Sequence, residues 1–329
     1  MEEHYDYIIV GAGSAGCVLA NKLSENKKNT VLIIEAGGKD TNLFIHMPSG
    51  YSQIVPNSSK LNYGFETEPE SNTAGRKLFW PRGRGWGGSS SINAMIYTRG
   101  HSSDYDHWRQ LGNPGWSYDD VLPYFKRAEN YEGDGDEEYH GKNGPLNVKK
   151  STRDDDILLD KFIEAGSQAG FPLTNDFNGK QQEGFSRYEH TIKGSKRFSS
   201  ARAYLHPALK RKNLYTKINI TVDKVVFKNK KAIGIEYINK GKRVFCRGNK
   251  EIILSSGAVN SPQILMRSGI GDSEEIKKHG IEIVHELKGV GKNLQDHIDE
   301  VSHVQCKKQV TLHRAANFLV TLTAVVRTI

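Results

Sequence analysis

The sequence predicts an α/β fold with a mainly parallel sheet, and three observations lead to it. The apolar run YDYIIV at residues 5–10 precedes a glycine turn, an amphipathic segment and a second apolar run, VLII, at residues 31–34. Residues 214–256 hold several β-rich runs of alternating polarity, separated by Asn, Lys and Gly turns. The 329 residues suit one large domain or two interwoven ones. Strand, helix and strand in this order are typical of parallel strands joined by a crossover helix.

The charge distribution argues against nucleic-acid binding. The formal net charge is +8, but the lysines and arginines are scattered and no nucleic-acid motif accompanies them. We expect a solvated basic surface, and attachment to an anionic membrane surface is the alternative that this charge permits. No apolar stretch reaches the roughly 18 residues of a membrane-spanning helix. The N-terminus MEEHYDY carries acids where a signal peptide needs bases. The expected location is therefore cytoplasmic, with the inner face of a membrane as the alternative.

The spacing of cysteines and histidines predicts no metal site. Cys17, Cys246 and Cys306 are widely separated and form no CxxC pair. The histidines are not matched by other ligands at metal spacing. We expect reduced, mostly buried thiols and no bound metal.

The first glycine loop, GAGSAG at residues 11–16, lies between the first predicted strand and a helix. Gly11 permits the sharp turn, Gly13 lets the backbone approach a pyrophosphate, and Gly16 lets the helix pack closely on the strand. The helix N-terminus offers N–H groups and a partial positive charge to phosphates. Glu35 ends the second strand and can accept hydrogen bonds from ribose hydroxyls, whereas a 2′-phosphate would be repelled there. This pattern indicates a dinucleotide, but it does not distinguish NAD from FAD.

The second glycine loop, RGRGWGGSSSIN at residues 82–93, does not follow the GxGxxG spacing. Trp86 and Ile92 within it, and Met95 to Tyr97 after it, are too apolar for a freely solvated loop. A buried segment rich in glycine and hydroxyl groups suggests close backbone contact with a large flat ligand.

Three stretches together resemble the signatures of the glucose–methanol–choline (GMC) oxidoreductase family. They are residues 83–93, with Tyr97, Gly100 and Asp106 following; residues 257–271, which begin GAVNSPQIL; and residues 289–297, GVGKNLQDH. The motifs stand in the family's order, and the resemblance covers essentially the whole chain. Details such as FIHMPSG, LFWPRG, DFNG and RFSSARAYLHPAL are most similar to the branch with choline dehydrogenases and acceptor-linked alcohol dehydrogenases.

The resemblance implies FAD rather than NAD. The first loop would hold the ADP half, and the second would lie along the pyrophosphate and the flavin ring. Position matching puts residues 93–96 at the flavin, Val222 at the adenine and Asp296 near the ribityl chain or ring. The candidate cofactor-binding residues are Gly11, Gly13, Ser14, Ala15, Gly16, Glu35, Ala36, Gly87, Gly88, Ser90, Asn93, Ala94, Met95, Ile96, Val222 and Asp296. Some relatives attach FAD covalently through a histidine where this chain has Ile92, so we expect noncovalent FAD.

The resemblance also implies a Rossmann-like FAD-binding domain interwoven with an incomplete α+β substrate domain. We expect residues 1–150 and 196–300 in the FAD-binding domain, and residues 151–195 and 301–329 in the substrate domain. Residues 154–171 predict an amphipathic helix with an acidic start. Residues 130–147 are acidic and rich in glycine, so they predict a surface loop, and they lack calcium-loop spacing.

The function implied by the resemblance is FAD-dependent oxidation of a primary alcohol, choline or an aliphatic alcohol, to the aldehyde. Electrons would pass to a quinone or another acceptor. The family's catalytic histidine lies in a C-terminal portion that has no counterpart here, so no catalytic residue is assigned. The chain ends at the apolar NFLVTLTAVVRTI, and we expect it to be truncated. The alternative is a catalytically inactive flavin-binding fragment that a second polypeptide could complete, and a lyase that uses FAD structurally is also open.

Overall fold

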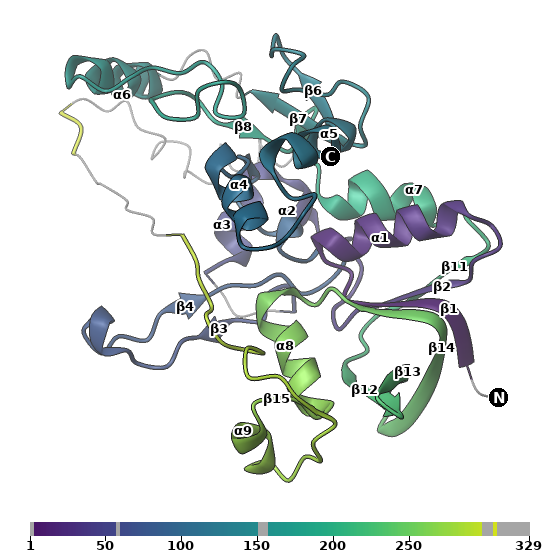
Figure 1. Cartoon of the computed structure of the whole chain (residues 1–329). Helices are drawn as coiled ribbons and strands as arrows, with labels where there is room; N and C mark the ends of the chain where they lie inside the picture. Colours follow the sequence, from purple (N-terminus) through teal and green to yellow (C-terminus); the bar gives the residue numbers. More distant parts are fainter. Residues whose placement is uncertain (1–2, 57–59, 151–156, 298–304, 308–329) are drawn as a thin grey trace. The chain divides into compact units, whose positions relative to one another are not determined.

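The computed structural model describes residues 3–56, 60–150, 157–297 and 305–307, which form two compact units (Figure 1). The sheet unit consists of residues 3–45, 50–56, 60–93 and 199–297. The second unit consists of residues 46–49, 94–150, 157–198 and 305–307. The apolar run at the C-terminus, and most of the predicted segment 301–329, lie outside the described residues.

A six-stranded sheet with the order β11-β2-β1-β14-β13-β12 is the framework of the sheet unit. β11, β2, β1 and β14 run parallel, and β13 and β12 extend the sheet antiparallel. The bounds are β1 Glu3–Val10, β2 Val31–Ile34, β11 Leu214–Lys217, β12 Val222–Lys228, β13 Lys231–Asn239 and β14 Lys242–Leu254. The predicted α/β fold with a mainly parallel sheet is confirmed.

The core of the sheet unit is built around β1 and β2. Ile8 pairs with Leu32 on one side and Ile252 on the other, and both Ile8 and Leu32 are fully buried. All four residues of β2 are buried. Parallel strands that are covered on both faces need apolar side chains on both, which explains why these runs do not alternate.

The helix that follows the first glycine loop begins where the sequence predicts it. α1 (Ser14–Glu25) joins β1 to β2 and lies beside α7 (His206–Ala208) in Figure 1. The Asn21 amide donates a hydrogen bond of 2.7 Å to the carbonyl of Tyr204, in the helical turn Ala201–Leu205. α8 (Gly257–Arg267) follows β14, and Arg267 at its end forms an ion pair with Asp223 of β12.

Several short elements complete the sheet unit. They are α3 (Tyr51–Ile54), β3 (Phe65–Glu66), the turn Ser71–Thr73, β4 (Phe79–Trp80), the turn Gly88–Ser91, β15 (Ile270–Gly271), α9 (Ser273–Lys277) and β16 (His285–Glu286). α2 (Leu43–His46) and the turn Pro48–Gly50 include the residues where the chain passes from one unit to the other.

The second unit is built on a four-stranded sheet with the order β5-β8-β7-β6. Its strands are β5 (Ile96–Tyr97), β6 (Glu129–Glu132), β7 (Leu146–Lys150) and β8 (Glu189–His190). Its other elements are α4 (Ser102–Gln110), α5 (Tyr118–Ala128), α6 (Ile157–Gln168), β9 (Ile192–Lys193) and β10 (Lys196–Arg197). His101 and Ser117 begin α4 and α5 with capping boxes, and α6 corresponds to the predicted amphipathic helix.

The division into units differs from the predicted domain boundaries chiefly at residues 94–150, and also at the short stretches 46–49 and 196–198. Residues 94–150 belong to the second unit, because β5, β6 and β7 all join the sheet that contains β8. The chain re-enters the sheet unit at Ser199, close to the predicted residue 196. The assignment of these units to cofactor and substrate stays a prediction.

The predicted surface loop at residues 130–147 is wrong in part. Tyr131 is 7% exposed and His140 is 3% exposed, and the ends of the stretch belong to β6 and β7. Residues 132–138 are mostly exposed, as the polar composition suggested, whereas His140 is buried and paired with carboxylates.

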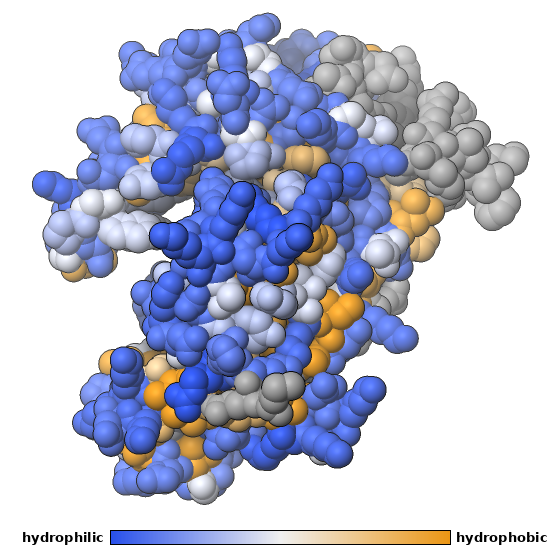
Figure 2. All heavy atoms as spheres, turned by 90° about the vertical axis from the view of Figure 1, so that its right-hand side faces the viewer, coloured by the Kyte–Doolittle hydropathy of each residue, from blue (hydrophilic) through white to orange (hydrophobic). Residues whose placement is uncertain are grey.

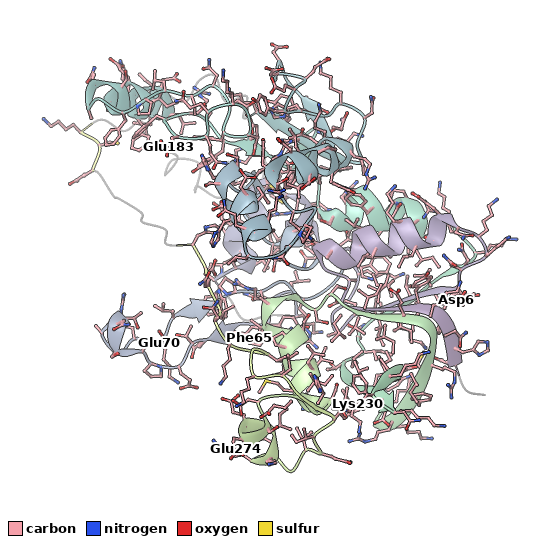
Figure 3. All side chains as sticks on the ribbon, viewed as in Figure 1. Asp6, Phe65, Glu70, Glu183, Lys230 and Glu274 are labelled. Carbon is pink, nitrogen blue, oxygen red and sulfur yellow. The ribbon has the colours of Figure 1, made fainter. Side chains whose placement is uncertain are left out.

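The surface is mostly hydrophilic on the face shown in Figure 2, where small hydrophobic groups interrupt it. Charged side chains such as Glu70, Lys230 and Glu274 are exposed (Figure 3). In the part of the chain that the structure describes, no helix is long and apolar enough to cross a membrane. The same residues include no group of three or more His, Cys, Asp or Glu arranged to hold a metal.

Two of the three cysteines are buried, as predicted. Cys17 and Cys246 are free thiols inside the sheet unit, and Cys306 is half-buried. Burial raises the pKa of the Cys17 and Cys246 thiols to about 12, so both remain protonated near neutral pH.

Candidate functional site

The two glycine loops meet in the sheet unit. The Gly87 N–H donates a hydrogen bond of 2.8 Å to the carbonyl of Ala12. Gly88 has a φ of +53°, and a Cβ atom there would lie 2.8 Å from the Cα of Gly13. Since a side chain at residue 88 would force the loops apart, the close approach requires glycine.

The three glycines of the first loop have different surroundings. A Cβ at Gly11, whose φ is +102°, would lie 2.6 Å from the carbonyl oxygen of Ser255, and one at Gly16 would lie 1.9 Å from that of Gly11. A Cβ at Gly13 would have only the Ser255 carbonyl oxygen near it, at 3.8 Å. Packing therefore requires glycine at residues 11 and 16, whereas Gly13 leaves space on the side of a cavity that it lines.

Glu35 lies at the centre of the contact between the loops. Its carboxylate accepts hydrogen bonds from the N–H groups of Ala12 at 2.8 Å, Gly37 at 2.8 Å and Gly85 at 3.0 Å. Burial raises the pKa of this carboxyl, although the three N–H donors and Arg84 oppose the rise. A carboxylate has about four acceptor positions, so three bonds leave Glu35 able to accept one more, from a ligand hydroxyl.

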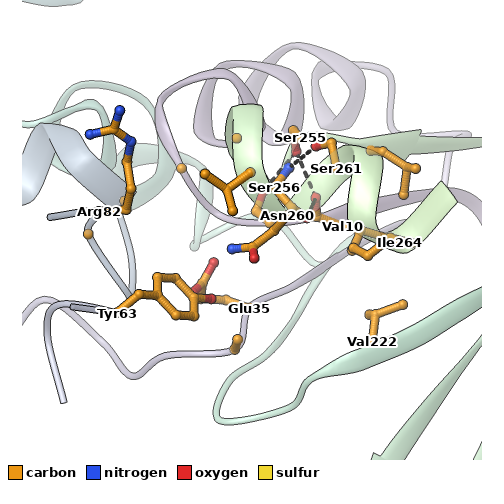
Figure 4. A pocket seen from close by; sticks show the side chains of 18 of the residues that line it. Val10, Glu35, Tyr63, Arg82, Val222, Ser255, Ser256, Asn260, Ser261 and Ile264 are labelled. Atoms are coloured by element: carbon orange, nitrogen blue, oxygen red, sulfur yellow. Dashed lines mark hydrogen bonds between the residues drawn. The ribbon is translucent and has the colours of Figure 1, made fainter. Parts of the chain in front are cut away.

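A cavity of about 700 Å³ opens beside these loops. Its walls come from within residues 10–15, 34–36, 63–65, 82–89, 220–222 and 254–264, all in the sheet unit. In Figure 4, Glu35 and Asn260 point toward each other beside the ring of Tyr63, with Arg82 to one side and Val222 to the other. Burial raises the pKa of Tyr63 to about 12, so its phenol is neutral.

Two helices begin at this cavity. Gly13 precedes α1 and Ser256 precedes α8, and neither N-terminus has a side-chain cap. The first residues of both helices line the cavity. Uncapped N–H groups and the helix dipole favour an anion there, and Arg82 adds a positive charge to the same wall.

The structure brings about half of the candidate cofactor-binding residues to the cavity wall. They are Gly11, Gly13, Ser14, Ala15, Glu35, Ala36, Gly88 and Val222. Gly16, Gly87, Ser90 and Asn93 belong to the same unit but do not line the cavity. Asp296 accepts hydrogen bonds from Trp80 at 3.1 Å and from the cavity-lining Arg82 at 3.2 Å.

The other three candidates, Ala94, Met95 and Ile96, belong to the second unit. Met95 is buried and has a φ of +65°, a left-handed conformation that is strained for a side chain of this size. Whether these residues contact a flavin stays a prediction.

Sequence reasoning missed several cavity residues. Tyr63 and Phe65, whose rings stack with centroids 5.1 Å apart, lie in a stretch with no recognisable motif. The small residues Ser255, Ser256 and Ala258 and the polar Asn260 also line the wall. Ala258 and Asn260 belong to the second family-like stretch, and Ser255 and Ser256 directly precede it in the run IILSSGA, whose small residues let the backbone approach a cofactor.

Ile92 points into an apolar cluster rather than the large cavity. It is 3% exposed and packs with Ile45 and Ile54. It has no group that could bond to a flavin.

The cavity fits a dinucleotide. Its volume lies within the 300–1,000 Å³ that is usual for cofactor sites. It combines two uncapped helix N-termini for phosphates, a carboxylate with a spare acceptor position, and glycines that let a ligand approach the backbone.

Comparisons with known proteins agree with this reading. The family profile described as GMC oxidoreductase matches residues 5–299. The chain is 47% identical over 322 residues to human mitochondrial choline dehydrogenase, and 46% identical over 316 residues to an oxygen-dependent choline dehydrogenase of Vibrio vulnificus. Each match covers 95% of this chain but only 53% and 56% of the relatives. The chain therefore spans about half the length of the curated relatives it matches.

Solved structures match over a similar share. Pyridoxine 4-oxidase from Mesorbium loti has a TM-score of 0.81 and 33% identity, over 86% of this chain and 55% of the other. Formate oxidase has a TM-score of 0.78 and 26% identity, over 86% and 50%. The profile match spans most of the sequence, and the fold and glycine-rich cavity agree with it. The chain belongs to the GMC oxidoreductase family.

Proposed function

We propose that this chain is the FAD-binding portion of an oxidoreductase that converts a primary alcohol, choline or an aliphatic alcohol, to its aldehyde. The observation that carries the proposal is the cavity formed where the two glycine loops, Glu35 and the N-termini of α1 and α8 converge. Support comes from membership of the GMC family and from 46–47% identity to choline dehydrogenases.

The residues of the cavity would each hold a part of FAD. Glu35 would accept a hydrogen bond from a ribose hydroxyl, and the N–H groups at the start of α1 would bind the pyrophosphate. Val222 offers apolar contact to the adenine. FAD, when bound, supplies the acceptor for hydride. The residues of this chain hold and orient it, and Ile92 provides no covalent attachment, so we propose noncovalent binding.

The electron acceptor is proposed to be a quinone or another carrier, as in an acceptor-linked dehydrogenase. The names of the bacterial relatives describe oxygen-dependent enzymes, so oxygen is a competing acceptor for a test. No residue of this chain is assigned as catalytic base.

A second candidate function is a catalytically inactive flavin-binding fragment. It is favoured by the chain covering only 53–56% of its choline dehydrogenase relatives. In that case the remaining portion, supplied as a second polypeptide, would restore turnover.

Flavin absorption and its bleaching distinguish these functions. The purified chain should show the blue absorption band of bound flavin. Under anaerobic conditions, bleaching by choline or by a linear alcohol would support the alcohol dehydrogenase. Absorption without bleaching, followed by bleaching after addition of the C-terminal half of a relative, would support the fragment. A protein that bound no flavin and instead reduced NAD with alcohol would contradict both.

The proposed location remains the cytoplasm, with the inner face of a membrane as the alternative. The human relative is named as mitochondrial, which makes the mitochondrion a third location to test. Fractionation of cells that express the tagged chain, with a salt wash of the membrane fraction, separates these cases.

A further inference from the structure

The second unit contains a ring of buried polar groups. Arg99 follows β5, and its Nη2 donates a hydrogen bond of 3.0 Å to Oε2 of Glu129, at the start of β6. His140 lies between two carboxylates. Its Nδ1 is 3.1 Å from Glu129 Oε2, and its Nε2 is 2.7 Å from Asp176 Oδ2.

Asn178 closes this ring. Its N–H donates to Asp176 Oδ1 at 2.8 Å, and its Oδ1 accepts from the backbone N–H of Arg99 at 2.7 Å. Its Nδ2 donates to the carbonyl of Tyr97 at 3.1 Å. One side-chain amide thus donates to the last residue of β5 and accepts from Arg99, two residues further on, as a neighbouring strand would. We name Arg99, Glu129, His140, Asp176 and Asn178 the charged ring.

Three members of the charged ring are shielded from water, and the side chain of Asp176 is 20% exposed. The side chains of Arg99, Glu129 and His140 are 2%, 0% and 0% exposed. Buried charges are tolerated only when they are paired, and loss of one partner leaves the other uncompensated. The ring therefore depends on the charge of each member.

Two further titratable groups face His140. The ring of Tyr131 stacks on the imidazole with centroids 4.0 Å apart, and its hydroxyl donates to Glu189 at 3.2 Å. Glu189 also accepts from Asn178 Nδ2 at 2.6 Å. Burial raises the pKa of Glu189. His140 is therefore surrounded by three carboxyl groups and one phenol, and Arg99 pairs with one of these carboxyl groups, Glu129.

The geometry favours a proton on both nitrogens of His140. Each nitrogen lies opposite a carboxylate oxygen, so a neutral imidazole would turn a lone pair toward one of them. Burial lowers the pKa of His140, but hydrogen bonds to Asp176 and Glu129 outweigh it and raise the pKa to about 9.

We propose that the charged ring fixes the position of β5 and of the residues that lead into it. Its hydrogen bonds hold β5 in place while His140 is charged. β5 follows directly from the second glycine loop through Ala94 and Met95. Its other side is held by β8 and by Thr191, whose N–H donates to the Met95 carbonyl at 2.8 Å. An effect of the charged ring on the flavin rests on the proposed function, which places residues 93–96 at the flavin. The positioning of β5 by the charged ring does not depend on the proposed function.

Backbone hydrogen exchange tests the positioning directly. The 329-residue chain without FAD is followed from about pH 7 to about pH 10, on both sides of the His140 pKa of about 9, with rates corrected for intrinsic exchange. The amides of residues 97–99 and 178 should be protected at neutral pH. Their protection should fall about tenfold or more above the His140 pKa.

Variants distinguish the effect of the charged ring on amide protection from a general effect of pH. His140→Gln should lose the protection of residues 97–99 already at neutral pH, while His107→Gln, an exposed position on α4, should behave as the parent chain. Asp176→Asn keeps the side-chain shape but removes one carboxylate, so the loss of protection should move to lower pH.

Unchanged protection of residues 97–99 across this pH range in the parent chain would overturn the proposal, as would a fully protected His140→Gln chain. If circular dichroism shows that His140→Gln does not fold, the Asp176→Asn variant serves as the test. Loss of amide protection at the same pH as in the parent chain would then overturn the proposal. A chain that lacks FAD altogether contradicts the proposed function but not the positioning. Bound FAD with a visible spectrum that is constant through the transition would show that the ring does not act on the flavin.

Discussion

A Cβ atom at Gly88 would lie 2.8 Å from the Cα of Gly13. Two loops that are far apart in the sequence therefore touch along their backbones, directly beside the N-terminus of α1. Through this contact a single wall combines a phosphate-binding turn with the second glycine loop. This close approach of the two loops requires glycine at residue 88.

Substitutions at Gly13 and Gly16 should separate ligand binding from folding. Gly16→Ala places a methyl group 1.9 Å from the Gly11 carbonyl oxygen and should reduce the free energy of unfolding by about 1–3 kcal/mol or more. Gly13→Ala meets no atom closer than 3.8 Å, and its φ of −74° is allowed for alanine. It should leave unfolding in urea unchanged but weaken FAD binding about tenfold. Equal loss of stability in both variants would contradict this.

Glu35→Gln should weaken the contact between the loops. Glutamine can keep its carbonyl oxygen at the position that accepts from Gly37 and Gly85, but its NH₂ group then faces the N–H of Ala12. Because two donors would then face each other, the free energy of unfolding should fall by about 1–3 kcal/mol. Urea unfolding without FAD measures this cost, and a separate FAD titration measures the lost ribose contact. Glu70→Gln, at an exposed position, is the matched control.

The bound FAD should be released on denaturation. Ile92 is packed with Ile45 and Ile54 and offers no atom for a covalent link. After acid precipitation the flavin should remain in the supernatant, and a denaturing gel should show no fluorescent protein band. Retained fluorescence on that band would show a covalent link elsewhere in the chain.

Stability should depend on pH through His140 and Asp176. The pKa of His140 is raised from 6.5 to about 9 in the folded chain, so its contribution is complete below pH 6.5 and is lost as the pH rises through about 9. The loss should be on the order of 3 kcal/mol, as pKa linkage implies. Urea unfolding at a series of pH values should show a decline that is absent in His140→Gln and present in His107→Gln.

Asp176 should determine how the stability of the chain changes at acidic pH. Burial raises the pKa of this carboxyl, but the hydrogen bonds from His140 and from the Asn178 N–H outweigh it and leave the pKa below 3.8. Its contribution to stability is therefore present above pH 3.8 and lost as the pH falls through the lowered pKa. Asp176→Asn should flatten this part of the stability curve, and an unchanged acid transition in that variant would contradict the assignment.

The sequence predicted the parts of the fold in which one local pattern determines one element. The apolar run before residues 11–16, the helix after them and the acid at Glu35 are all found where the spacing places them. Val222 also lies on the cavity wall, as position matching suggested. Such features depend on contacts between residues that are close in sequence or on a long motif.

What could not be predicted depends on contacts between distant segments. Tyr63 reaches the cavity only because its stretch lies against the second glycine loop, where the Arg84 N–H donates to the carbonyl of Leu61 at 2.8 Å. His140 stands in a polar, acidic stretch that looks like a solvated loop, and its burial follows from pairing with Glu129 and Asp176. Composition alone does not distinguish a charge that is solvated from one that is buried and neutralised by a partner.

The cavity wall is assembled from residues between Val10 and Ile264, so it is complete only after residue 264 has been synthesised. A ribosome that has released the first glycine loop, β2 and the second glycine loop has still to deliver α8, which carries Asn260 and one of the two uncapped helix ends. Until then the nascent chain holds an open half-site. If the cavity holds FAD as proposed, flavin retention by ribosome-bound chains of increasing length should begin only once α8 has been synthesised.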